Sequence, residues 1–80
     1  MYILAQNKKT IVEFSRIEVS SNLTMKKEEK YVLIAHYNTS ANSVSSSTII
    51  GSYPSEEAAL KELRSIFTAL SAEQPVYEVR

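Results

Sequence analysis

The stretch that decides the fold is "IIGSYPSEEAALKELRSIF", residues 49–67, in which a β-branched run passes into a helix. Pro54 has no backbone N–H and cannot extend a strand ladder, so it ends the strand that precedes it. Ser55 is a favourable N-cap, and Glu56 and Glu57 follow where the helix dipole favours negative charge. The sequence therefore predicts a strand that ends at this junction and a helix that begins there.

Gly51 lies inside the predicted strand, which runs over residues 48–53. A glycine at such a position indicates a bulge or a close approach of another backbone. A single glycine matches neither of the glycine-rich loops that hold phosphate groups, and the two first-turn glutamates would repel an anion. The junction is therefore interpreted as architectural.

Apolar residues recur along the helix at spacings of three and four, which is typical of an amphipathic helix with one buried stripe. The predicted stripe consists of Ala59, Leu60, Leu63, Ile66, Phe67 and Leu70. The helix is expected to end at "AEQP", residues 72–75.

Three earlier segments have the apolar and β-branched character of strands. They are residues 2–6, 10–20 and 31–37. In the second segment the alternation slips by one residue between Phe14 and Ile17. We therefore expect a bulge or bend near Ser15 and Arg16, which would keep all its apolar side chains on one face. Asn7 is expected to take the positive φ angle of the first turn.

The element order predicts an α+β fold in a single domain, residues 1–80. The expected sheet is an antiparallel β-meander of four to five strands, with one C-terminal helix packed on one face. The order is β-β-β-β-α, with a possible final strand at residues 76–79. The Ser- and Asn-rich residues 38–47 are expected to form a hairpin connection.

The strand at residues 31–37 is apolar on both faces, whereas one helix can cover only one face. A second copy of the chain is the simplest cover for the other, so the sequence predicts a homodimer. The expected interface consists of Tyr31, Leu33 and Tyr37, and another protein partner is a further possibility. Small domains often gain stability by such association.

The composition argues against several kinds of function. Nine basic residues balance nine acidic ones, so the basic excess of phosphate-binding proteins is missing. The chain has no cysteine and no aspartate, and His36 is its only histidine. Metal sites, cofactor motifs and a nucleophile beside a base are therefore not expected. The sequence predicts a non-enzymatic protein-interaction or regulatory domain without metal or cofactor.

Tyrosines provide the alternative hypothesis, because aromatic side chains on a sheet can stack single-stranded bases. All five fall in or beside predicted strands: Tyr2, Tyr31, Tyr37, Tyr53 and Tyr77. The charges for nucleic-acid binding would come from loop lysines at positions 8, 9, 26 and 27. Core and rim packing is the first explanation for these tyrosines and protein contact the second, and the neutral composition disfavours nucleic acid.

No apolar run reaches the roughly 20 residues that span a bilayer. The first charges follow a short apolar stretch, which is the reverse of a signal peptide. A cytoplasmic protein is expected.

The segments "AQNKKTIVEFSRIEV" and "IIGSYPSEEAALKEL" together resemble small uncharacterised proteins of low-GC Gram-positive bacteria and their phages. The shared residues include Gln6, Gly51, Tyr53 and Ser55. The chain departs from that pattern at Asn7, where Asp is usual, and at residues 13–14, where Asn-Cys is common. The resemblance implies the same fold and a bacterial or phage setting. It implies no activity and no catalytic residues.

Overall fold

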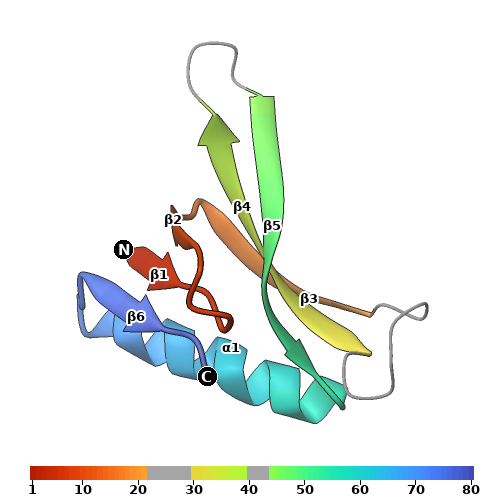
Figure 1. The fold of residues 1–80 in the computed structure, drawn as a ribbon. Helices are drawn as coiled ribbons and strands as arrows, with labels where there is room; N and C mark the ends of the chain where they lie inside the picture. The colour runs from red at the N-terminus through yellow and green to blue at the C-terminus, as the bar shows by residue number, and fades with distance from the viewer. Residues whose placement is uncertain (22–29, 40–43) are drawn as a thin grey trace.

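A single helix crosses two small sheets in the computed structural model, which describes residues 1–21, 30–39 and 44–80 (Figure 1). The described chain is α+β, as predicted, with six strands and one helix. In chain order these are β1 (Tyr2–Leu4), β2 (Ile11–Glu13), β3 (Arg16–Ser21), β4 (Tyr31–Thr39), β5 (Val44–Tyr53), α1 (Glu56–Ser71) and β6 (Val76–Glu78).

The first sheet has the strand order β2-β1-β6. β1 pairs antiparallel with β2, with Ile3 opposite Val12, and parallel with β6, with Ile3 opposite Tyr77. The possible strand at residues 76–79 is therefore confirmed as a strand. Its parallel pairing with the first strand makes the predicted single meander only partly correct.

The second sheet has the order β3-β4-β5 and is an antiparallel meander. Leu33 lies opposite Gly51, but the next residue, Ile34, lies opposite Ile49, so Ile50 is an extra residue in β5. The bulge predicted at Gly51 is confirmed. Ile50 is only 1% exposed, because the bulge turns its side chain into the core.

The long strand predicted at residues 10–20 is wrong, because the chain changes sheets in its middle. β2 ends at Glu13 and β3 begins at Arg16, and the backbone N–H of Ser15 donates to the carbonyl of His36 at 2.8 Å. The predicted shared face is nevertheless confirmed. Val12 lies in the core, and the apolar residues that follow in the segment, Phe14, Ile17 and Val19, pack against it.

The hairpin connection predicted at residues 38–47 is too long. β4 continues to Thr39 and β5 starts at Val44, and these two residues lie opposite each other. Ladder hydrogen bonds join backbone groups, so serine and asparagine do not prevent pairing here. Residues 40–43 lie outside the described part of the chain.

The turn between β1 and β2 also differs from its prediction. Lys8, not Asn7, has the positive φ angle, at 63°. The side-chain oxygen of Asn7 accepts from the N–H of Lys9 at 2.9 Å, and the N–H of Lys8 donates to the carbonyl of Ala5 at 2.8 Å. Asn7 thus stabilises the turn through its side chain, and its neighbour takes the left-handed conformation.

The predicted helix start is confirmed. The Ser55 hydroxyl accepts from the N–H of Ala58 at 3.1 Å, and α1 follows with Glu56 and Glu57 in its first turn. The predicted buried stripe is confirmed at Ala59 and Ile66, and Leu63 is partly buried against the core, but the other three predicted residues are exposed. The buried side chains are Ala59, Glu62, Ile66 and Ala69, whereas Leu60, Phe67 and Leu70 are exposed.

Hydrogen bonds from the C-terminal segment explain why a charged residue, Glu62, occupies the buried stripe. Its Oε2 accepts from the Tyr77 hydroxyl at 2.8 Å and from the Arg80 N–H at 3.0 Å. The Tyr53 hydroxyl donates to the Arg80 carbonyl at 3.3 Å. A buried carboxylate is tolerated when hydrogen bonds replace water, and the C-terminal segment supplies them here.

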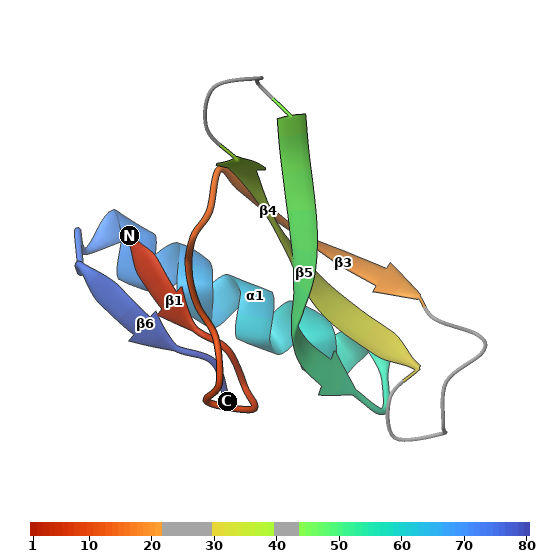
Figure 2. The same cartoon turned by 45° about the horizontal axis from the view of Figure 1, so that its top comes forward.

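One core joins the two sheets and the helix, which lies across both of them (Figure 2). The first sheet and its flanks contribute Ile3, Ala5, Val12 and Val79, the second sheet contributes Leu33, Ala35, Ile50 and Tyr53, and α1 contributes Ala59 and Ile66. All described elements pack around this core.

Gly51→Ala is expected to destabilise the fold by about 1–3 kcal/mol, the usual cost of overpacking. A Cβ at this position would lie 2.6 Å from the Tyr53 hydroxyl oxygen and 3.0 Å from its ring. Tyr53 is 7% exposed and cannot move away freely. Urea unfolding measures the change.

The same substitution in a Tyr53→Phe background provides the control. Removing the hydroxyl relieves the closest contact, so Gly51→Ala should cost less there. Equal costs in the two backgrounds would show that Tyr53 is not the obstacle.

The structure also predicts how stability falls at high pH. Burial, and then the charge of Glu62, raise the pKa of the Tyr53 hydroxyl above its ordinary value of 10.0. Burial and the hydrogen bond to Glu62 raise the pKa of Tyr77 in the same direction. The unfolded chain therefore loses these protons first, so this stabilisation is complete below pH 10 and is lost as the pH rises above it.

Urea unfolding between pH 8 and pH 11 tests this expectation. The free energy of unfolding should fall across that range, and more steeply for the wild type than for a Tyr53→Phe, Tyr77→Phe double variant. Identical slopes would contradict it.

Candidate functional site

The residues predicted as an interface lie on the covered face of the second sheet. Leu33 is 0% exposed, and Tyr31 and Tyr37 are half-buried against the core. The premise that this face is left open is wrong, because the first sheet and α1 both pack there. Tyr37 lines a hollow with Ile11 and Thr48. These three residues therefore do not form an open surface.

His36 lies on the opposite, outer face of the second sheet with Arg16 and Glu18 of β3. Its Nε2 is 2.6 Å from a carboxylate oxygen of Glu18 and 3.4 Å from the Arg16 guanidinium. Neighbours thus supply partners for Nε2, as expected of a half-buried strand histidine. Within the described residues, no group of three or more His or Glu side chains could hold a metal ion.

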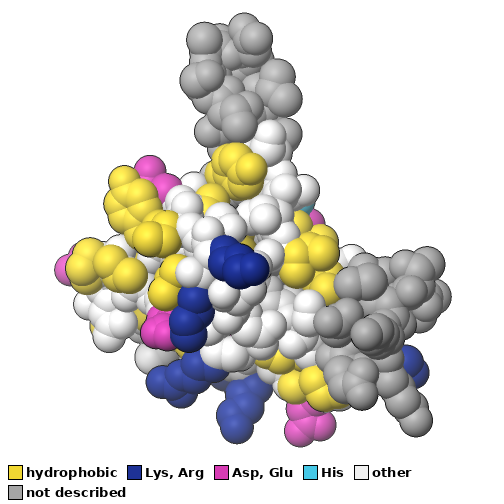
Figure 3. All heavy atoms as spheres, viewed as in Figure 1, with side chains coloured by type: hydrophobic (Ala, Val, Ile, Leu, Met, Phe, Trp, Pro, Cys, Tyr) yellow, Lys and Arg dark blue, Asp and Glu magenta, His cyan; other side chains and the backbone are white. Residues whose placement is uncertain are grey.

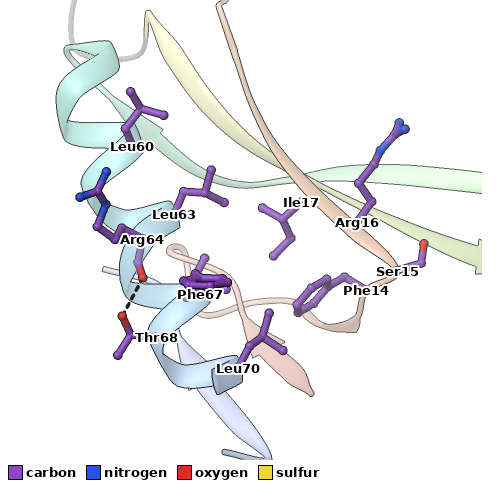
Figure 4. A pocket seen from close by; sticks show the side chains of 11 residues that line it. Phe14, Ser15, Arg16, Ile17, Leu60, Leu63, Arg64, Phe67, Thr68 and Leu70 are labelled. Atoms are coloured by element: carbon purple, nitrogen blue, oxygen red, sulfur yellow. Dashed lines mark hydrogen bonds between the residues drawn. The ribbon is translucent and has the colours of Figure 1, made fainter. Parts of the chain in front are cut away.

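A groove between α1 and the β2–β3 link is the site that the geometry favours (Figure 4). One wall is the second helical stripe, formed by Leu60, Leu63, Phe67 and Leu70. Phe14 and Ile17 face it from the other side. The hollow has a volume of about 890 Å³, which is in the range of binding pockets.

The groove exposes large apolar side chains to solvent. Phe67 is 67% exposed, Leu60 is 46% exposed and Leu70 is 43% exposed. Isolated exposed apolar residues are common, but a contiguous group beside a hollow is typical of an interaction surface. We use the name "α1–β3 groove" for this surface of Phe14, Ile17 and the second helical stripe.

Two arginines border the α1–β3 groove from opposite sides. Arg64 extends from α1 and Arg16 extends from β3, both away from the hollow (Figure 4). The described residues that line the groove include no acidic side chain. Arg16 lies 3.6 Å from Glu18 of its own strand, an exposed pair that solvent weakens. The groove is therefore apolar inside and basic at its margin.

The tyrosines do not form a stacking surface in the described chain. Tyr53 is buried, Tyr77 donates to Glu62, and the two tyrosines of β4 pack against the core. Tyr2 is 50% exposed, but it lies in the other sheet. Figure 3 shows the hydrophobic side chains of one face in separate groups, divided by polar and charged surface.

The sequence predicted that Leu60, Phe67 and Leu70 lie in the core, whereas the structure exposes them in the groove. The available signal was the width of the apolar arc on the helix, which holds two stripes offset by one residue. The buried stripe consists of Ala59, Glu62, Ile66 and Ala69. The next residue in the sequence after each of these lines the groove. The buried stripe was not recognised in the sequence because it contains Glu62, and a charged residue is normally expected to face solvent.

The two segments that carry the family resemblance meet in the structure. The N–H of Gln6 donates to the carbonyl of Ile50 at 2.7 Å, and its side-chain oxygen accepts from the N–H of Ser52 at 2.9 Å. Gln6 therefore joins the β1–β2 turn to the bulge of β5. The shared residues Gln6, Gly51, Tyr53 and Ser55 all have structural roles.

Comparison with protein-family models, with curated proteins and with solved structures found no match. The resemblance to small Gram-positive and phage proteins stays a prediction. Among the described residues, α1 lacks the length and apolar character that a bilayer-spanning helix needs.

Adjacent helix residues provide a test of the groove. Ile66→Ala should cost about 2–5 kcal/mol, because Ile66 is 1% exposed in the core. Phe67→Ala should change stability by no more than about 0.5 kcal/mol, because its ring contributes little to the core. Urea unfolding at one low protein concentration compares them. Equal losses would mean that Phe67 is a structural residue and that the groove is not available for binding.

Proposed function

We propose that this chain is a non-enzymatic protein-interaction domain that acts as a homodimer, with the α1–β3 groove as its contact surface. The observation that carries the proposal is the exposure of Phe67, Leu60 and Leu70 beside one hollow. Burying such side chains is a main source of association energy. The proposed interface therefore lies on the helix and at the edge of the second sheet, and not on the β4 residues predicted from the sequence.

The size of the chain supports a second copy as the occupant. A domain of 80 residues has a thin core. The helix contributes only two of its apolar side chains, Ala59 and Ile66, to the core cluster of buried residues. A second copy would bury the apolar stripe that one chain leaves exposed.

Single-stranded nucleic-acid binding, the alternative from the sequence, has weaker support. Its tyrosines are divided between the core and two sheets, and the formal net charge is zero. The absence of enzymatic activity and the cytoplasmic, bacterial or phage setting belong to the same proposal. The support for that setting is the sequence alone.

The mass of the purified chain in solution tests the proposal. Light scattering at tens of micromolar should give twice the 9.0 kDa of one chain. Phe67→Ala should weaken dimerisation roughly ten-fold or more, as expected for an aromatic residue at the centre of an interface. Ile11→Ala is the matched control, because Ile11 is 68% exposed but lies outside the groove.

A monomeric wild-type chain would overturn the homodimer. In that case, displayed peptides that bind the wild type but not Phe67→Ala would indicate a different protein as the occupant. Binding of labelled single-stranded DNA at low salt would instead favour the nucleic-acid alternative. Equal weakening by Ile11→Ala would place the interface outside the groove.

A further inference from the structure

The α1–β3 groove meets the start of β3, the edge strand of the second sheet. Four consecutive residues line the groove, two from the β2–β3 link (14–15) and the first two of β3 (16–17). Among them, Arg16 belongs to the outer face of the sheet and Ile17 to the inner face, as their pairing with β4 requires. A hollow bordered by both faces of one strand faces that strand's edge.

That edge has no strand partner in the described part of the chain. β3 is the terminal strand in the order β3-β4-β5, so one side of its backbone pairs with β4 and the other does not. An unpaired edge presents alternate N–H and C=O groups that can bind a further strand. The groove therefore combines main-chain donors and acceptors with an apolar wall on α1.

We infer that a second copy of this chain occupies the groove by pairing its own β3 antiparallel with this edge, with Ile17 opposite Ile17 of the partner. This inference rests on the proposed homodimer and specifies its geometry. The two second sheets become one six-stranded antiparallel sheet. The inner-face side chains of each β3 extend toward Phe67 and Leu63 of the other copy.

The charges of β3 select this register. With Ile17 at the two-fold axis, Arg16 of each copy lies opposite Glu18 of the other, on the outer face. Opposite charges directly across two strands stabilise the pair. An axis at Glu18 would oppose two carboxylates, and an axis at Arg16 would oppose two guanidinium groups. Each of those alternatives is destabilising.

Cysteine cross-linking tests the register directly, because the chain contains no cysteine of its own. Residues directly opposite in antiparallel strands have Cα atoms about 4.5–5.5 Å apart, within the span of a disulfide. Ile17→Cys should therefore form a covalent dimer under mild oxidation. Val19→Cys is the matched control, since its two copies would lie about 13 Å apart and should not cross-link.

Charge reversal gives a second test that does not depend on the cysteine variants. Arg16→Glu and Glu18→Arg should each weaken dimerisation roughly ten-fold, and the double variant should restore it. Urea unfolding of each variant separates loss of dimer from loss of fold. A double variant that dimerises no better than the single ones would overturn the register.

The results also separate this inference from the proposed function. A wild-type dimer in which Val19→Cys cross-links and Ile17→Cys does not would overturn the pairing but leave the homodimer in place. A wild-type monomer would overturn both. Efficient cross-linking of Ile17→Cys, together with rescue by the double charge reversal, would support both.

Discussion

The buried carboxylate of Glu62 determines how the helix lies on the rest of the chain. Its hydrogen bonds from the Tyr77 hydroxyl and the Arg80 N–H hold one particular helical stripe against the core. Because α1 turns that stripe inward, the stripe one residue further on turns away from the core. The exposed leucines and phenylalanine of the α1–β3 groove are a geometric result of that rotation. A fold with a solvent-facing Glu62 would have buried them.

The change of sheet at Phe14 and Ser15 supplies the other half of the groove. It ends the first sheet at β2 and starts a new edge at β3, so the phenylalanine ring lies at the junction. The helix runs below both sheets (Figure 1), and Phe14 lines one hollow together with Phe67 and Leu70 of that helix. An apolar helix stripe, a strand edge and an aromatic side chain therefore meet at one place, although they come from separate parts of the sequence.

Local signals in the sequence were sufficient for local structure. The strand end was predictable from Pro54, the helix cap from Ser55 and the bulge from Gly51. Each of these residues acts through its own backbone or its nearest neighbours. Pairings between distant segments were not predictable in this way. The parallel partner of β1 and the hydrogen bonds of Glu62 both depend on the C-terminal segment. The groove was missed for the same reason, because the rotation of the helix is a tertiary property.

The parallel pairing of β1 with β6 has a consequence for the order of folding. Tyr2 lies opposite Val76, so this contact spans nearly the whole chain. Closing so large a loop is slow compared with forming a hairpin or a helix. During synthesis β1 can pair with β2 early, but its pairing with β6 forms only after residues 76–78 are made, and Glu62 lacks its hydrogen-bond donors until then. The second sheet, with local connections only, is free to form first and to act as the surface on which the remaining elements assemble.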